Sequence, residues 1–218
     1  MAADARSAVL ARIRAANAHS SALNTATAEY DAIPRTYMQS SSLSQEESLE
    51  LLTERLHDYN AQVVRCRAAE VPAQIEAILN QRRLVRLVIP PGFPAAFLPE
   101  DIEVTTDSGL TATALDAFDA AISLTTLAIA ETGTLVLQNL PGQGRRALSL
   151  IPDVHLCLVN VRDVVTTVPE AFARLESTST LPLTFVSGPS ATADIEMTRI
   201  KGVHGPRFLH VLLIESQD

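Results

Sequence analysis

The residues between 187 and 206 combine side chains that can bind anions and exchange protons. Two apolar runs border this segment, 183–186 on one side and 208–214 on the other. Both runs have the length and the β-branched and aromatic content of short buried strands. Loops between the strands of α/β sheets commonly carry binding and catalytic groups. The side chains of this loop with that capacity are Ser187, Ser190, Thr192, Asp194, Glu196 and His204.

The local structure after Ser190 has two interpretations. Ser190 or Thr192 could cap a helix that begins near Ala191, and the free N–H groups of its first turn would then bind an anion. The alternative is a capped helix whose Asp194 and Glu196 only complement the helix dipole. These two acids are two residues apart and do not share a helix face, which argues against a paired general acid and base.

His204 is followed by Gly205 and Pro206, which predicts an accessible loop histidine. Histidine is the side chain that exchanges a proton most readily near neutral pH, so His204 is a candidate proton acceptor. Together with Asp194 and Glu196 it offers oxygen and nitrogen ligands for a divalent ion. Their spacing matches no metal-binding signature, so no metal site is predicted.

A second polar motif, Glu131-Thr132-Gly133-Thr134, separates two apolar runs. A buried carboxylate is costly unless a cation or a hydrogen-bond donor pairs with it, and a glycine permits close approach of the backbone to a ligand. One interpretation is therefore a carboxylate that faces a pocket and pairs with Arg145 or Arg146. The other is a turn between strands with a solvated glutamate.

The segment 141–146, Pro-Gly-Gln-Gly-Arg-Arg, supplies flexible backbone followed by two guanidinium groups. A guanidinium matches the oxygens of a carboxylate or a phosphate in pairs. A surface loop with solvated arginines is equally consistent with this pattern. The glycine spacing does not complete a dinucleotide-binding fingerprint, and the single lysine of the chain, Lys201, is not part of a phosphate-binding loop.

The composition limits the class of protein. Of the 218 residues, 47% are hydrophobic and 19% charged, which suffices for one sizeable core. A formal net charge of -8 argues against a surface for nucleic acid or an anionic membrane. The first residues lack the apolar segment of a signal peptide, and no apolar run reaches the ~18 residues of a membrane span. We therefore expect a cytoplasmic protein without a membrane span.

The two cysteines, Cys66 and Cys157, argue against several cofactors. An iron–sulfur cluster takes about four thiolates, and a structural zinc ion needs further ligands at close spacing. Cys157 lies in the apolar run 154–159, where a cysteine usually behaves as a small buried apolar residue. We expect no cofactor in this chain.

The elements that position these motifs begin after a polar N-terminal region. Apolar residues at helical spacing predict a helix over 6–18, and the polar stretch that follows to residue 42 predicts an irregular connection. The run 44–47, Ser-Gln-Glu-Glu, is a capping-box signature that starts a helix through Leu56. We therefore divide the chain into an N-terminal extension, 1–43, and a domain, 44–218.

Strand and helix signals alternate through the rest of the chain. Apolar, β-branched runs predict strands, and proline or capping residues before a helical period predict helices. This alternation predicts an α/β fold with a mainly parallel sheet covered by helices on both faces. Strands are predicted at 62–66, 84–89, 102–104, 127–130, 134–137, 154–159, 183–186 and 208–214, and helices at 72–79, 115–122, 145–150 and 167–175.

The chain contains several motifs in a fixed order: 130–136, then Arg146 with 149–152 and His155, then 187–190 with 192–196, and finally 202–206. This ordered set resembles the LUD domain of the lactate utilization protein C family (LutC/YkgG). The resemblance covers the chain from residue 44 to the C-terminus.

The resemblance implies a fold similar to the ribose-5-phosphate isomerase, CoA-transferase and formyltetrahydrofolate cyclo-ligase group (NagB/RpiA/CoA-transferase-like), which agrees with the α/β prediction. It also implies a role in the oxidation of L-lactate to pyruvate beside iron–sulfur subunits. Two cysteines fit a subunit without its own cluster, so the clusters are expected in the partner subunits. The expected partners are those subunits and a small anionic ligand such as lactate or pyruvate.

By motif position, the resemblance gives Glu131 and His204 as candidate catalytic residues. The nucleophile role of Glu131 follows an analogy with CoA transferases, and Arg146 with the N–H groups near Ser190 would hold a carboxylate. The candidate ligand-binding residues are Thr132, Gly133, Thr134, Arg146, Ser187, Gly188, Ser190, Asp194, Glu196 and Gly205.

The sequence leaves two other functions open. One is a stand-alone enzyme that acts on a phosphate, a nucleotide or a CoA thioester, with Glu131 as nucleophile or base. The other is a scaffold or regulator without catalysis, in which the polar loops form an interface. Stabilisation of the isolated chain by lactate would distinguish a binding protein from a scaffold.

Overall fold

The computed structural model of the chain describes residues 2–17, 28–100, 102–192, 200–202 and 204–215. It contains two compact units, residues 1–38 and 39–218, whereas the sequence places the boundary between residues 43 and 44. In the first unit, α1 (Ala2–Asn17) forms where a helix is predicted. In the described ranges, no helix has the length and hydropathy that crossing a membrane requires.

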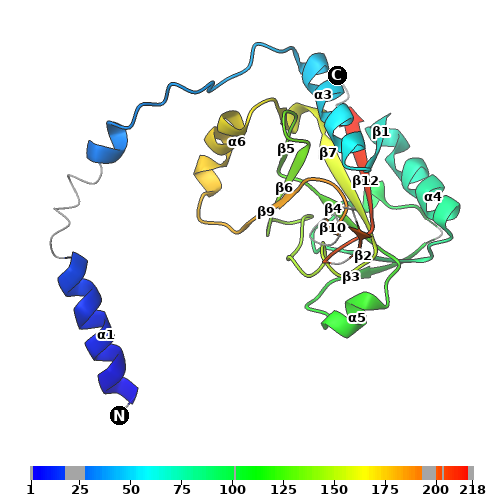
Figure 1. The fold of residues 1–218 in the computed structure, drawn as a ribbon. Coiled ribbons are helices and arrows are strands. Elements are labelled where there is room, and N and C mark those ends of the chain that lie inside the picture. Colours follow the sequence, from blue (N-terminus) through cyan, green and yellow to red (C-terminus); the bar gives the residue numbers. More distant parts are fainter. Residues whose placement is uncertain (1, 18–27, 101, 193–199, 203, 216–218) are drawn as a thin grey trace. The chain divides into compact units, whose positions relative to one another are not determined.

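A six-stranded sheet forms the centre of the second unit (Figure 1). All neighbouring strands in it run parallel, which confirms the predicted α/β fold. The sequence predicts five of its six strands, all except β4, with boundaries that differ from the observed ones by at most two residues. In spatial order the strands are β1 (Gln62–Arg67), β12 (Phe208–Glu215), β7 (Val154–Asn160), β4 (Ala120–Leu124), β2 (Arg86–Ile89) and β3 (Glu103–Thr106).

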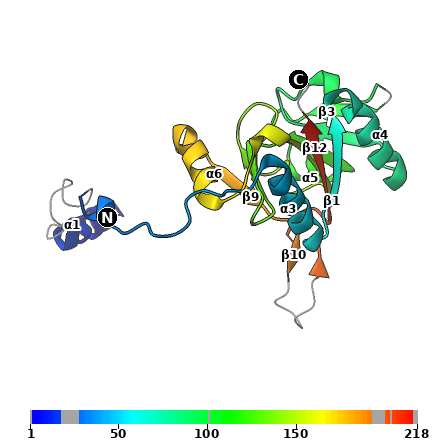
Figure 2. The same cartoon turned by 90° about the horizontal axis from the view of Figure 1, so that it is seen from above.

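Helices cover both faces of this sheet because successive strand residues point to opposite sides. On one face, Ile75 shares a buried cluster with Leu156 of β7. On the other face, Leu52 packs in a cluster with Val211 of β12, and Leu115 packs beside β2 and β4. Both α3 and α4 lie beside β1 (Figure 1 and Figure 2). The helices of this unit are α3 (Gln45–Asp58), α4 (Val71–Arg82), α5 (Ala112–Asp116) and α6 (Val168–Leu175).

A smaller four-stranded sheet joins the α3 side of the central sheet. Its Ala128 and Leu135 belong to the same buried cluster as α3, and its opposite side packs against Leu175 of α6. The apolar runs on either side of Glu131 form an antiparallel pair in this sheet. In spatial order its strands are β8 (Val164–Val165), β5 (Leu127–Ile129), β6 (Thr134–Gln138) and β9 (Leu183–Val186). Short 3-10 helices are η1 (Ala68–Glu70), η2 (Ala95–Phe97), η3 (Val161–Asp163) and η4 (Glu176–Thr178).

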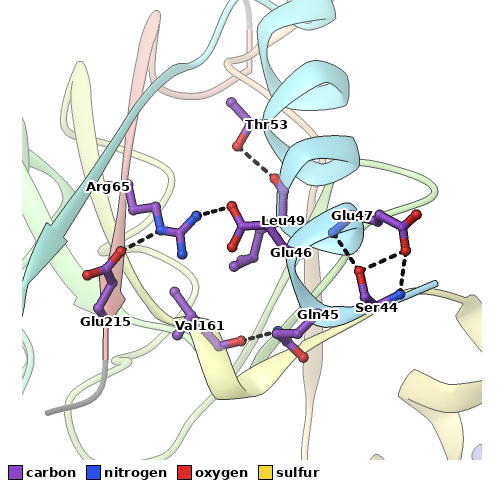
Figure 3. A network of polar contacts seen from close by, with 9 residues as sticks. All are labelled: Ser44, Gln45, Glu46, Glu47, Leu49, Thr53, Arg65, Val161 and Glu215. Atoms are coloured by element: carbon purple, nitrogen blue, oxygen red, sulfur yellow. Dashed lines mark hydrogen bonds and ion pairs between the residues drawn. The ribbon is translucent and has the colours of Figure 1, made fainter. Parts of the chain in front are cut away.

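Polar contacts fix the start of α3 to the central sheet (Figure 3). Ser44 Oγ accepts a hydrogen bond from the N–H of Glu47 (3.3 Å), and Glu47 Oε2 accepts one from the N–H of Ser44 (2.7 Å), which confirms the predicted capping box. Arg65 of β1 pairs with Glu46 of α3 and, from Nε to Oε1 at 2.6 Å, with Glu215 of β12. One guanidinium therefore joins the helix to two neighbouring strands.

The predicted helix over 115–122 is wrong. In the structure α5 ends at Asp116 and β4 begins at Ala120. Alanine favours a helix in isolation, but Ala120 and Ala121 lie fully buried between β2 and β7, where a small side chain fits. Tertiary packing therefore overrides the local preference.

The predicted short helix over 145–150 is also wrong. The segment consists of turns, one of which is closed by a bond from the N–H of Leu148 to the carbonyl of Arg145 (3.0 Å).

No helix begins at Ser190 either. Residues Ala191–Thr192 form β10, which pairs antiparallel with β11 (Ile200–Lys201). The N–H of Ser190 donates to the carbonyl of Pro206 (2.8 Å). The expected anion site at a helix N-terminus is therefore not formed at residues 190–192.

Candidate functional site

A cavity of about 230 Å³ lies where the loop after β9 meets the segment before β12. Its remaining walls come from the segment before β7 and from the first residues of β7 and β12. We call it the Arg146 cavity. Of the predicted site residues, it brings together Arg146, Ser187, Gly188, Ser190, His204 and Gly205; Ser149, His155 and Leu209 also line it.

Hydrogen bonds hold the loop after β9 against the segment before β12. Besides the bond from Ser190 to Pro206, the N–H of Gly202 donates to the carbonyl of Ser190 (2.9 Å). The hydroxyl of Ser190 accepts a bond from the N–H of His204 (3.1 Å). His204 is exposed, as predicted, and these bonds keep it beside Ser190.

Gly188 allows this loop to pass close to the end of α3. Its φ is +95°, and a Cβ built on it would lie 2.5 Å from the Cβ of Tyr59. Only a residue without a side chain tolerates both the backbone conformation and the contact. The glycine therefore fixes the position of Ser187 and Ser190 on the cavity.

Arg146 brings a positive charge to the cavity. Its Nη1 donates to Ser149 Oγ (3.1 Å), and Ser149 Oγ donates to the carbonyl of Arg146 (3.2 Å). Among the described residues, no aspartate or glutamate forms an ion pair with Arg146. The neighbouring Arg145 differs, because it pairs with the buried Asp107. Arg146 therefore keeps guanidinium N–H groups for a ligand.

His155, the second residue of β7, forms a buried wall of the cavity. Its exposed fraction is 1%, and its Nε2 lies 2.9 Å from Oγ of Ser123 in β4. The Sγ of Cys157 lies 3.4 Å from the same nitrogen. Burial, and then the charge of Arg146, lower the pKa of His155 to about 4, and burial raises the pKa of Cys157 to about 12. At neutral pH both groups are uncharged, and the burial of Cys157 agrees with the prediction of a small buried residue.

A chain of hydroxyl groups connects the motif 131–134 to the cavity. Thr132 Oγ1 donates to Thr134 Oγ1 (2.7 Å), and Thr134 Oγ1 lies 2.7 Å from Oγ of Ser187. Gly133 has a φ of +60°, and a Cβ there would lie 2.8 Å from the Cβ of Arg55 in α3. Through these hydrogen bonds Thr132 and Thr134 hold the hydroxyl of Ser187 at the cavity, and Gly133 lets their turn pack against α3.

Glu131 is exposed in the turn between β5 and β6, where its N–H donates to the carbonyl of Thr166 (3.0 Å). It is not among the described residues that line the Arg146 cavity. Its predicted partner Arg145 instead pairs with Asp107, Nε to Oδ2 at 2.7 Å, and no described ion pair joins Glu131 to Arg146. The predicted pairing is wrong, and the alternative of a solvated glutamate agrees with the exposure. A catalytic role for Glu131 stays a prediction.

Asp194 and Glu196 lie outside the described residues, so their place relative to His204 stays a prediction. In the described part of the chain, no group of three or more His, Cys, Asp or Glu side chains could hold a metal ion.

Sequence analysis did not assign His155 and Ser149 to the site. His155 lies in an apolar strand run, and most polar residues in such runs pack in the core without a role in a site. A signal was nevertheless present: His155 and Cys157 are two residues apart and therefore on one face of a strand. Two polar groups on one buried face point to a polar site above it.

Comparisons with known proteins agree with this architecture. The sequence model of the LUD domain matches residues 2–214, so the match includes the N-terminal residues. The chain is 42% identical over 175 residues to "Lactate utilization protein C" of Deinococcus radiodurans, which covers 79% of this chain and 82% of that protein. It is 36% identical over 107 residues to "Lactate utilization protein C 1" of Bacillus mycoides, 46% of this chain and 45% of that one.

A solved structure has the same fold. It is the crystal structure of a DUF162 family protein from Deinococcus radiodurans, with a TM-score of 0.69 and 38% sequence identity over 79% of this chain and 99% of that one. The family match and these relatives lead to one conclusion: this chain belongs to the LUD domain family.

Proposed function

We propose that this chain takes part in lactate utilization by binding a small carboxylate, lactate or pyruvate, in the Arg146 cavity. The names of the relatives from D. radiodurans and B. mycoides support the process. The observation that carries the proposal is the position of Arg146, whose guanidinium lies on a cavity lined by hydroxyls and pairs with no described carboxylate. A ligand carboxylate supplies the missing anion.

The remaining lining fits a hydroxy or keto acid. A guanidinium binds a carboxylate through two parallel N–H···O bonds. The hydroxyls of Ser187 and Ser190 can donate to or accept from the 2-hydroxyl of lactate or the keto oxygen of pyruvate. The cavity of about 230 Å³ is smaller than the ~300–1,000 Å³ typical of pockets for drug-sized ligands, which suits a three-carbon acid.

His204 is the proposed proton acceptor. Oxidation of L-lactate to pyruvate removes two electrons and two protons. His204 takes the proton of the 2-hydroxyl group, and the hydrogen on C2 leaves with the two electrons to the redox partners. His204 is exposed and is held beside Ser190, which favours exchange of that proton with water. The buried His155 has a pKa of about 4 and serves instead as a neutral wall.

We assign the electron acceptors to iron–sulfur partner subunits, and the assembly to the cytoplasm. The two cysteines of the chain, Cys66 and Cys157, are both buried, and a cluster takes about four thiolates. The protein would then contribute substrate binding to a complex whose redox centres lie in other chains.

Thermal unfolding of the full chain with lactate or pyruvate tests the binding proposal. A ligand at a hundredfold excess over its Kd stabilises the native state by ~2.7 kcal/mol and raises the Tm. The variant Arg146→Gln should lose this rise, because it removes the cation. Arg162→Gln, a change at an exposed arginine that does not line the cavity, and Glu131→Gln should both keep it.

Two results would overturn the binding proposal. One is a wild-type Tm that neither acid changes, and the other is an undiminished rise in Arg146→Gln. Turnover of a phosphate, a nucleotide or a CoA thioester that Glu131→Gln abolishes would instead favour the stand-alone enzyme.

An anaerobic pull-down of the tagged chain from cells grown on lactate tests the partner proposal. We expect iron and lactate-oxidising activity to elute with the chain. Elution without iron would contradict the assignment of redox partners, even if lactate binds.

A further inference from the structure

A second cavity, of about 540 Å³, lies at the carboxyl ends of β2 and β3. Pro91 and Gly92 line it after β2, Asp107 and Gly109 line it after β3, and residues of the segment 139–145 complete it. We call it the Asp107 cavity. No described residue lines both cavities, and the Arg146 cavity lies at the opposite, amino ends of β7 and β12.

The strand order gives this position a general significance. β2 and β4 are neighbours, but the chain leaves β2 for β3 at the sheet edge, whereas the strands that follow β4 in this sheet are β7 and β12 on the other side. In open α/β sheets, ligands bind in the crevice at the carboxyl ends of strands where the order reverses in this way. The Asp107 cavity lies beside this crevice, at the neighbouring ends of β2 and β3, because the backbone of Gly142 bridges the ends of β2 and β4.

Backbone hydrogen bonds make its walls rigid. The N–H of Gly142 donates to the carbonyl of Pro91 after β2 (2.8 Å), and the N–H of Leu124 at the end of β4 donates to the carbonyl of Gly142 (2.7 Å). The N–H of Asp107 donates to the carbonyl of Ile89 (2.8 Å). Three loops are therefore tied together around a preformed space.

Arg145 is the positively charged group on the cavity, and Asp107 compensates its charge. Its Nε donates to Asp107 Oδ2 (2.7 Å), and its Nη2 donates to Asp107 Oδ1 (3.0 Å) and to the carbonyl of Leu110 (2.5 Å). The side chain of Asp107 is 2% exposed and that of Arg145 is 40% exposed. These bonds hold the guanidinium plane in one orientation and leave part of it accessible.

The carboxyl group of Asp107 stays ionised at neutral pH. Burial raises the pKa of its carboxyl group, but hydrogen bonds from Arg145 and from the N–H groups of Leu110 and Gly109 outweigh burial and hold the pKa below its usual range. Arg145 therefore has a permanent counter-charge, and the cavity does not attract anions as the Arg146 cavity does.

We propose that the Asp107 cavity binds a planar nitrogen heterocycle of the nucleobase type, stacked on Arg145. A fixed guanidinium plane is a good surface for stacking on an aromatic ring. Pro91, Leu140 and Pro141 supply apolar walls, and the exposed Asn139 offers one amide that can donate to and accept from the polar edge of the ring. The proposal concerns a cavity separate from the lactate site and does not rest on it.

Isothermal titration calorimetry of the full chain with adenosine and with AMP tests this assignment. Adenosine and AMP should bind with similar affinity, because the lining holds no uncompensated cation for a phosphate. Arg145→Lys keeps the charge but loses the plane, so we expect adenosine affinity to fall about tenfold. Arg207→Lys is the matched control, because Arg207 makes the same two-bond pair with Asp153 but does not line the cavity.

A second variant keeps the test valid if Arg145→Lys does not fold. Asn139→Ala removes only an exposed side chain and should also weaken adenosine binding. Three results would overturn the proposal: no binding of either probe by the wild type at millimolar concentration, unchanged affinity in a folded Arg145→Lys, or binding of AMP at least tenfold tighter than adenosine. The last would indicate an anion site.

Discussion

Two buried histidines should dominate the response of this protein to acid. His155 and His210 each have a pKa of about 4, lowered first by burial and then by the charge of Arg146 and of Arg82, respectively. Arg82 Nε donates to His210 Nε2 (2.9 Å), which requires that nitrogen to be unprotonated. In the unfolded chain a histidine titrates near ~6.5.

The pH dependence of stability follows from this difference. Between pH ~6.5 and the native pKa of about 4, the unfolded chain binds protons that the native chain does not. The free energy of unfolding therefore falls as the pH falls, by ~1.4 kcal/mol per pH unit for each histidine. His155→Gln cannot titrate, so its slope in urea denaturation series should be smaller by about one proton. A slope equal to that of the wild type would show that His155 is already protonated in the native state.

At the scale of elements, the sequence predicted every strand of the central sheet except β4, where packing decides between helix and strand. Continuous apolar runs such as 154–159 and 208–214 are typical of parallel strands buried on both faces, and they became β7 and β12. The segment 115–122 has small residues that suit a helix as well as a buried strand. Only its neighbours β2 and β7 determine which forms, and the local sequence does not contain them.

The candidate site was predictable in the same partial way. The motif order indicated that Arg146, Ser187, Ser190 and His204 act together, and the structure places them on one cavity. The sequence could not assign the partners of Arg145 and Arg146, because these depend on the direction in which each side chain leaves a turn. Asp107, the partner of Arg145, lies in the loop after β3, far from Arg145 in the sequence, and no local sequence pattern predicts the pair.

The capping box at the start of α3 gives a prediction at this scale. Ser44→Ala removes the acceptor for the N–H of Glu47 and should lower the free energy of unfolding by ~1 kcal/mol. Chemical denaturation measures the change. Ser42→Ala is the control, because the exposed Ser42 side chain makes no hydrogen bond to a described residue, and its effect should be within ~0.5 kcal/mol of zero. Equal effects of the two substitutions would contradict a stabilising cap.

At the scale of the whole molecule, the C-terminal strand β12 supplies the hydrogen-bonding partner of β1. β12 lies between β1 and β7, so the edge strand β1 has only β12 as a partner in the central sheet. Its residues Leu209, Val211, Leu212, Leu213 and Ile214 are all buried. The central sheet therefore cannot form completely before residues 208–215 pair with β1 and β7. These contacts join residues that are far apart in the sequence, which slows folding.

A truncation after Arg207 should therefore prevent folding. Each buried aliphatic side chain lost contributes ~1.5–3 kcal/mol. The five together are comparable to a typical net stability of ~5–15 kcal/mol, and the unpaired backbone groups of β1 and β7 add a further cost. Circular dichroism and limited proteolysis measure the loss. A variant that ends at Glu215 retains β12 and should unfold at the wild-type temperature. A cooperative unfolding transition in the shorter variant would contradict this view of the sheet.

Arg145 and Arg146 share one peptide bond, yet they line cavities at opposite ends of the sheet. A ligand that binds one guanidinium is therefore separated from the other by one peptide unit of the backbone. Where binding in one cavity shifts that backbone, thermodynamic reciprocity makes the effect of each occupant on the affinity of the other equal.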